Sequence, residues 1–486
     1  MALRRILPFR LPFQENARWG IWGLLVSQSF DGALESRLGR AVAGPVVYSR
    51  AGEYRNIVLL MLLVALAAVC SCIYIYARHL NGPPIRSDGF GYYAYLPSIF
   101  VDHNLELGPA LHNMPQGTTS FEFGINPAKE TGRYFDKYAI GTAFLQSPFF
   151  LLAHAVAGVT GDSRTGYSTP YQIANTFSAI VYLCVGMFFL YRALRTRQSE
   201  MVSLCVVAVT ILATNVFHYA TYDASFSHVY QFALTSLLLY LLLVARAQGP
   251  VLPLRMVAAL GVVTGLIALT RMTNIVFSLL TAVLLVERWI QYRNARVFMG
   301  HSLFAGGLAL AVLFPQFLYW KLSTGHWLVN AYFEVGEDAK FYWARPELAN
   351  FLFSIRKGAL FWTPLLALAL MGLPSLVRRM GWLGWAIVLV LCIHVYVCAS
   401  WYCWTFGGSF GSRPMVDVMP LFALSMGVVL ERFWEIRRGG IMAAVCIAFT
   451  MLNLVLMYAY WRGFVPFDGA DIATLANLPR HLLNGY

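Results

Sequence analysis

The sequence predicts an all-α protein that crosses a membrane many times, and three observations predict this fold class. Of the 486 residues, 58% are hydrophobic and only 12% are charged, whereas about a quarter of the residues of a typical soluble domain are charged. The mean hydropathy is +0.60. Apolar runs of nearly the ~20 residues that a spanning helix needs recur along the chain. These features exclude a disordered chain, a collagen and a secreted disulfide scaffold.

Eleven apolar runs are predicted to span the membrane. They cover residues 57–77, 171–191, 201–218, 226–245, 256–270, 272–287, 299–320, 359–377, 382–400, 414–430 and 441–461. A twelfth run, 138–158, contains Gln146, Pro148 and His154. Counting it as a span would place every Arg-rich loop outside, so we expect it to form an interfacial helix on the outer face.

The distribution of positive charge predicts the orientation. The chain has a net charge of +13, and with 138–158 not spanning, the segments on the side of the N-terminus carry all of this excess. Lys and Arg are enriched in cytoplasmic loops. We therefore expect a bacterial inner-membrane protein with a cytoplasmic N-terminus and a periplasmic C-terminus.

The same topology predicts the division of the chain. Residues 1–56 form a basic cytoplasmic arm and 57–461 the transmembrane domain, followed by a periplasmic tail, 462–486. The first periplasmic loop, 78–170, is the longest, and the second is 321–358. The inner loops are short and basic, without a phosphate-binding glycine motif, so we expect any chemistry at the outer face.

Two acidic positions stand out in the first periplasmic loop. Asp88 follows closely on the first span, in Arg-Ser-Asp-Gly-Phe-Gly-Tyr-Tyr, and precedes Tyr92 and Tyr93. It is either a helix cap or a functional acid. Asp136 and Lys137 stand side by side at the far end of the loop, either as a snorkelling pair at a helix end or as one wall of a site.

Together these features resemble the GT-C superfamily of membrane glycosyltransferases, in the branch of the protein O-mannosyltransferases and lipid A aminoarabinose transferases. In that branch the early acid is catalytic, and a second acid precedes Lys-Pro-Pro. Asp136 and Lys137 match the acid and the lysine, but Tyr138 and Ala139 replace the prolines. The resemblance covers most of 57–430 and implies a GT-C bundle with interfacial helices in its first outer loop and with Asp88 and Asp136 as catalytic residues.

Transfer from a lipid-linked sugar needs a general base on the acceptor hydroxyl and cations on the departing phosphate. Asp88 is the predicted base. The predicted phosphate ligands are Arg271, Arg356, Lys357 and Arg413. Arg271 separates two short apolar runs, where a charge is costly and by default functional. The alternative is that Arg271 merely separates two helices and extends its side chain outward to the membrane surface.

Further side chains are predicted to contact substrate. They are Lys137, Tyr92, Tyr93, His218, Asp223, His228 and Trp404. Trp404 can equally belong to an aromatic belt. His218, Asp223 and His228 could in principle hold a divalent metal, but their spacing is weak, and no metal or other cofactor is expected.

The sequence therefore predicts an inverting glycosyltransferase that moves a sugar from a polyprenyl-phosphate donor to a lipid, glycan or protein acceptor, with no nucleic acid partner. A polytopic transporter or a flippase for lipid-linked glycans is one alternative, but it would need polar residues along a transbilayer path. An O-antigen ligase or polymerase is another, although such enzymes usually rely on a large later loop. A non-catalytic scaffold would leave Asp88 and Arg271 unexplained.

Overall fold

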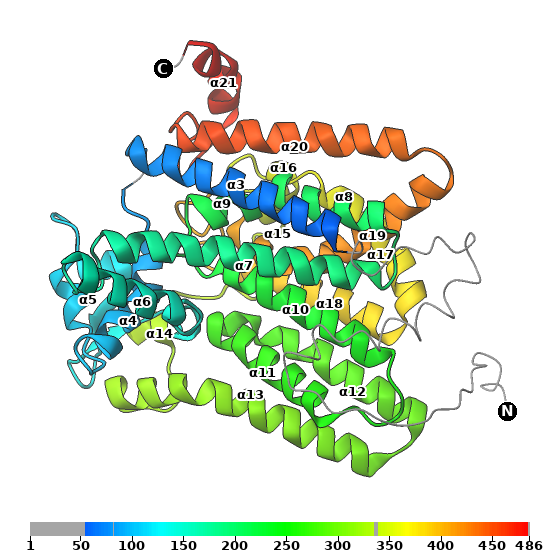
Figure 1. Cartoon of the computed structure of the whole chain (residues 1–486), viewed down its shortest axis with the longest axis horizontal. Coiled ribbons are helices and arrows are strands. Elements are labelled where there is room, and N and C mark those ends of the chain that lie inside the picture. Colours follow the sequence, from blue (N-terminus) through cyan, green and yellow to red (C-terminus); the bar gives the residue numbers. More distant parts are fainter. Residues whose placement is uncertain (1–53, 81, 335–338, 485–486) are drawn as a thin grey trace. The chain divides into compact units, whose positions relative to one another are not determined.

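A computed structural model describes residues 54–80, 82–334 and 339–484 (Figure 1). The predicted cytoplasmic arm, 1–56, lies almost entirely outside these residues. Helices make up most of the described chain, and its one sheet is a small hairpin, in which β1 (Ile125–Pro127) pairs antiparallel with β2 (Tyr134–Asp136). The predicted all-α class is therefore confirmed.

Nine helical segments among the described residues are long and apolar enough to cross a membrane. They are α3 (Arg55–Ala77), α6 (Gly141–Thr160), α7 (Thr169–Arg195), α10 (His228–Arg246), η2 with α12 (Met272–Phe277 and Ser278–Tyr292), α13 (Ala295–Thr324), α18 (Trp382–Ser400), η3 with α19 (Arg413–Val418 and Met419–Glu435) and α20 (Gly439–Trp461). The run predicted to lie at the interface, 138–158, forms α6, so its interfacial placement and the count of eleven spans stay predictions.

Three predicted spans are not among these nine; two of them are broken, and the third, α11, is a single helix of 17 residues. They correspond to α8 (Glu200–Leu212) with α9 (Val216–Thr221), α11 (Leu254–Thr270), and α16 (Ala359–Trp362) with α17 (Leu366–Met380). Pro364 explains the last break, because proline lacks the N–H that continues a helix. Between α8 and α9, Asn453 donates to the carbonyls of Leu212 and Thr214 at 2.9 and 2.8 Å. This satisfies carbonyls that the break exposes.

The helices pack closely at glycines. On α11, a Cβ at Gly261 would lie 2.5 Å from the Ala305 carbonyl oxygen, and one at Gly265 would lie 2.9 Å from that of Ala309. The two glycines are four residues apart and share one helix face. α11 therefore meets α13 through the small-residue spacing that lets membrane helices approach.

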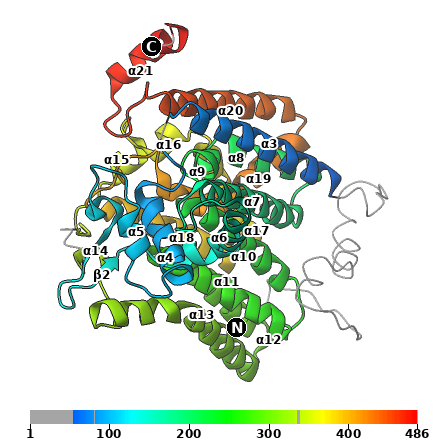
Figure 2. The same cartoon turned by 60° about the vertical axis from the view of Figure 1, so that its left-hand side comes forward.

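The first predicted periplasmic loop folds into a cap of its own. It contains α4 (Ser87–Phe100), α5 (Gly108–His112), η1 (Ser120–Phe123) and the β-hairpin. Figure 1 shows α4, α5 and α14 (Ala331–Glu334) together at the end of the bundle where α3 ends and α7 begins, and Figure 2 shows β2 beside α14. Phe90, Phe135 and Tyr319 belong to one buried cluster, so the cap packs on α13.

The remaining helices of the described chain are short. They are α15 (Leu348–Phe353) in the second predicted loop and α21 (Ile472–Asn484) near the C-terminus.

Candidate functional site

Asp88 lies in the first turn of α4. The N-cap position belongs to Arg86, which has extended backbone and no side-chain cap hydrogen bond. Asp88 is therefore not the cap that the alternative interpretation assumed. A carboxylate in the first turn is still favoured by the helix dipole, and its side chain points away from the helix toward another element.

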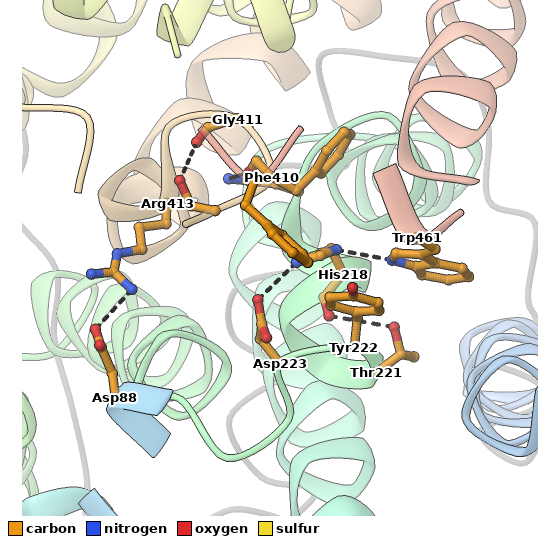
Figure 3. A network of polar contacts seen from close by, with 12 residues as sticks. Asp88, His218, Thr221, Tyr222, Asp223, Phe410, Gly411, Arg413 and Trp461 are labelled. Atoms are coloured by element: carbon orange, nitrogen blue, oxygen red, sulfur yellow. Dashed lines mark hydrogen bonds and ion pairs between the residues drawn. The ribbon is translucent and has the colours of Figure 1, made fainter. Parts of the chain in front are cut away.

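That element is η3. The Asp88 Oδ2 atom lies 2.8 Å from Nη1 of Arg413, the first residue of η3 (Figure 3). The side chains are 22% and 13% exposed respectively, so the ion pair is largely removed from solvent but still reachable. The structure thus brings together the predicted general base and one predicted phosphate ligand.

The surrounding charges determine the ionisation of Asp88. Burial alone would raise its pKa, but Arg413 and Lys137 outweigh burial and hold the pKa below the ordinary value of 3.8. The group is therefore a carboxylate at neutral pH. Asp88 is the centre of a site in which two cations face one acid.

Aromatic side chains line this site. The rings of Tyr92 and Tyr138 lie 4.5 Å apart, and the Lys137 ammonium lies 5.3 and 5.1 Å from the ring centres of Tyr138 and Tyr332. Cations at this range are attracted to the ring faces. Tyr138 and Tyr332 were not predicted; Tyr138 stands where the family pattern has proline, and Tyr332 comes from the second predicted loop.

Arg271 reaches the same region from the junction of α11 and η2. It interacts electrostatically with Tyr92, Tyr332 and Arg413. Its Nε lies 3.1 Å from Oδ2 of Asp417, a fully buried acid in η3. Arg271 therefore does not stand alone at membrane depth, because Asp417 balances its charge.

Asp417 has two further partners. Asn274 donates to its Oδ2 at 2.8 Å, and His228 Nδ1 lies 2.9 Å from its Oδ1. A carboxylate can only accept, so His228 carries its proton on Nδ1, and its Nε2 lies 3.4 Å from Arg271. The sequence reasoning missed Asp417, although an acid inside the predicted span 414–430 was a signal.

A second network, the Arg86 chain, joins Arg86, Asp223, His218 and Trp461. Figure 3 shows the part that runs from Asp223 through His218 to Trp461. Trp461 Nε1–H donates to His218 Nδ1 at 3.0 Å, which leaves the His218 proton on Nε2 to donate to Asp223 at 2.9 Å. Arg86 donates to the other Asp223 oxygen at 2.7 Å. Burial would raise the pKa of Asp223, but the His218 hydrogen bond and Arg86 lower it to about 2.

The predicted substrate contacts of His218, Asp223 and His228 stay predictions. Both ring nitrogens of His218 and both oxygens of Asp223 bond within the protein. His228 belongs to the separate network of Asp417. Within the described ranges, no three His, Cys, Asp or Glu side chains are arranged to hold a metal ion.

Two further predicted residues, Asp136 and Tyr93, are buried within the cap. Asp136 has no exposed surface; its Oδ1 accepts from the Tyr138 N–H at 2.8 Å, while Oδ2 has no partner among the described residues. Burial raises its pKa well above 3.8. The Tyr93 hydroxyl donates to the Gly166 carbonyl at 2.7 Å, and its ring packs in the core of the cap.

The other predicted phosphate ligands join the second loop to the C-terminal tail. Arg356 makes two bonds to Asp468, at 2.8 and 2.6 Å. The ammonium of Lys357 is buried and donates to the carbonyls of Ser409 and Phe467, and burial lowers its pKa to about 8. Trp404 is half-buried in the same turn before Arg413.

Comparison with known proteins shows the fold but no close relative. No family model and no curated protein matches the chain. The apo structure of ArnT from Cupriavidus metallidurans matches with a TM-score of 0.50 at 16% identity, over 90% of this chain and 74% of that one. ArnT is a membrane glycosyltransferase of the GT-C superfamily, so the predicted GT-C fold is confirmed.

Two further structures were matched at lower similarity. ArnT from Cupriavidus metallidurans bound to undecaprenyl phosphate gives a TM-score of 0.47 at 15% identity, over 90% of this chain and 74% of that one. The oligosaccharyltransferase AglB from Archaeoglobus fulgidus, in complex with an inhibitory peptide and a dolichol-phosphate, gives 0.47 at 11% identity, over 87% of this chain. The match spans only 57% of the AglB chain.

Proposed function

We propose that the protein is a glycosyltransferase that moves a sugar from a polyprenyl-phosphate donor to a lipid, glycan or protein acceptor. The reaction takes place at the periplasmic face of a bacterial inner membrane. The observation that carries the proposal is the Asp88–Arg413 ion pair of 2.8 Å, which joins the predicted base to a predicted phosphate ligand. The GT-C fold supports it, because it is a fold of membrane glycosyltransferases.

In this reaction Asp88 accepts the proton of the acceptor hydroxyl. The acceptor oxygen forms a bond to the anomeric carbon while the bond from that carbon to the phosphate oxygen breaks, which inverts the configuration. The carrier phosphate leaves with additional negative charge. A positioned general base typically contributes about 10²–10⁴-fold in rate.

Arg413 and Lys137 stabilise the departing phosphate. Both already act on the Asp88 carboxylate, and a guanidinium can make two parallel hydrogen bonds to phosphate oxygens. Arg271, held by Asp417, supplies a third cation. The site therefore holds more positive charge than Asp88 alone neutralises, as an anionic donor requires.

Donor binding also changes the pKa of Asp88. Arg413 lowers the pKa of Asp88, so an Asp88 paired with Arg413 is a weak proton acceptor. A phosphate that takes over Arg413 releases the carboxylate and raises its pKa. Asp88 thus becomes an effective base only when the donor is in place.

The decisive experiment compares Asp88→Asn with Asp102→Asn, a change at an exposed acid in the same loop. Mass spectrometry of glycolipids and surface glycans, with and without the gene, first identifies the product. Transfer is then measured with purified variants in lipid nanodiscs. Asp88→Asn should reduce transfer by about 10²-fold or more, and Asp102→Asn should leave it unchanged. Parental turnover by folded Asp88→Asn would reject Asp88 as the base.

A further inference from the structure

The segment that leads into α4 is fixed to the turn after α9 at several points. Ser225 Oγ donates to the Pro84 carbonyl at 2.9 Å, and Arg86 donates to the Tyr222 carbonyl at 2.6 Å as well as to Asp223. A Cβ at Gly89 would lie only 1.8 Å from Ser225 Oγ. The start of α4 therefore lies directly on residues 222–225.

The backbone between Arg86 and Asp88 is strained. Ser87 has φ +47°, a left-handed conformation that residues other than glycine rarely adopt. Such a conformation persists only where the surroundings determine it. Here the surroundings are the contacts of Arg86 on one side and the packing of Gly89 on the other.

We propose that the Arg86 chain is a positioning device that holds Ser87 left-handed and thereby directs Asp88 at the reacting atoms. The inference rests on the proposed function, because it takes Asp88 as the base. None of its four members has to contact substrate. Arg86, Asp223 and His218 act through the Asp88 backbone, and Trp461 fixes the far end.

Several contacts restrict the movement of each residue of the Arg86 chain. His218 is fully buried and bonds at both ring nitrogens. Trp461, at the end of α20, has its ring parallel to that of Tyr222, with an interplanar angle of 1°. The Arg86 guanidinium lies 4.8 Å from the centre of the same Tyr222 ring. Each member is thus held by hydrogen bonds and by packing.

The position of Asp88 relative to the reacting atoms must be accurate. A displacement of about 1 Å at reacting groups can cost on the order of 10²-fold in rate. If Ser87 relaxes to a negative φ, the first turn of α4 rotates and Asp88 moves relative to Arg413. The chemical step then slows, although the cations that hold the donor phosphate remain.

The test measures the single-turnover rate constant, the dissociation constant of the identified polyprenyl-phosphate donor and the Tm of each variant in nanodiscs. Asp223→Asn should lower the rate constant about 10–100-fold and leave donor affinity within about threefold. Arg86→Lys, which keeps the charge but loses the planar fork, should fall between parent and Asp223→Asn. Glu287→Gln is the matched control, because it breaks the Arg246–Glu287 pair of 2.6 Å outside the site.

A second pair of variants tests the backbone directly and does not depend on Asp223→Asn folding. Ser87→Gly should keep the parental rate, because glycine adopts positive φ without strain. Ser87→Val should lose rate as Asp223→Asn does, because a β-branched residue disfavours this conformation. A purely structural role would lower Tm without changing the rate constant of the folded enzyme.

The outcomes separate the two proposals. If Asp88→Asn is inactive while Asp223→Asn and Ser87→Val turn over within about twofold of the parent, the positioning inference is wrong and the proposed function stands. If Asp88→Asn turns over like the parent, Asp88 is not the base, so the proposed mechanism and the positioning inference are both wrong.

Discussion

Asp88 and Arg413 form a 2.8 Å ion pair although they come from near opposite ends of the described chain. Asp88 belongs to the cap formed by the first loop, and Arg413 begins the segment that continues into α19. The pair therefore joins the cap to the transmembrane bundle at the proposed catalytic centre. Changes at either residue should affect both donor handling and proton transfer.

Arg413→Lys should impair transfer and Arg413→Ala should impair it further. Lysine keeps the charge but cannot make two parallel bonds to phosphate. Removing one such contact costs about 2–4 kcal/mol of transition-state stabilisation, by analogy with an oxyanion donor. The kcat/KM for the donor measures this loss. Arg432→Ala, which breaks an exposed i,i+3 pair, is the control, and parental kcat/KM in Arg413→Ala would contradict the assignment.

The acid limb of the pH–rate profile should depend on the donor. In the free enzyme the pKa of Asp88 lies below 3.8, so kcat/KM should not fall until the pH drops below about 4. The profile of kcat reports the enzyme–substrate complex, in which phosphate occupies Arg413 and the Asp88 pKa is higher. We therefore expect the acid limb of kcat at higher pH than that of kcat/KM; coincident limbs would show that the donor does not displace Arg413.

Arg271 should matter for the donor, and Asp417 for the fold. Arg271→Lys should weaken donor turnover and Arg271→Ala should weaken it more, by about 2–4 kcal/mol. Asp417→Asn leaves the Arg271 charge without its partner, which typically costs about 3–5 kcal/mol for a buried pair. Donor turnover and thermal unfolding on purified variants measure the two effects.

The double variant of Arg271→Ala with Asp417→Asn provides the check on this pair. It should be less destabilised than the sum of the single variants, because no lone charge remains. Additive changes in the free energy of unfolding would mean that the two residues are not coupled.

Asp136→Asn should cost much less activity than Asp88→Asn. The folded-state pKa of Asp136 is raised by burial, so the group favours folding at low pH and destabilises the protein as pH rises through that pKa. Asn cannot ionise. The variant should therefore lose less stability than the parent as the pH rises from about 4 toward that raised pKa, measured as Tm against pH. A loss of transfer as large as that of Asp88→Asn would instead assign Asp136 to the reaction.

Cysteine labelling tests the predicted orientation. In a background without the eight native cysteines, an impermeant reagent added from the periplasmic side should label Ser163→Cys and Asn477→Cys. It should not label Gly249→Cys, which lies after α10 at the opposite end. Labelling of Gly249→Cys from that side, or protection of both other sites, would reject the predicted topology.

Sequence patterns predicted the features that depend on local composition. Long apolar runs located most helices. The structure brings Asp88, Lys137, Tyr92, Arg271 and Arg413 into one region, while their roles stay predictions. What the sequence did not reveal depends on contacts between distant segments. The pairing of Arg271 with Asp417, and that of His218 with Trp461, appears only when η3 and α20 pack against the earlier helices.

Apolar periodicity also overestimated helix length where polar side chains or proline interrupt a run. The predicted span 201–218 breaks because Asn453, from α20, satisfies the carbonyls of the gap. Asn215 in the same gap donates to the Ser412 carbonyl at 3.1 Å, next to Arg413. The break therefore helps to position the site, and no signal within 201–218 could reveal its partners.

The late position of these partners has a consequence for membrane insertion. Lys357 bonds to the carbonyl of Phe467, and His218 accepts from Trp461, so groups well before α20 in the chain depend on residues at and beyond the end of α20. During synthesis the earlier helices enter the bilayer before those residues exist. The buried His218 and Lys357 remain without these partners until α20 has been inserted. The Arg86 chain is therefore complete only after α20 has been inserted, so we expect the proposed positioning of Asp88 to form late in assembly.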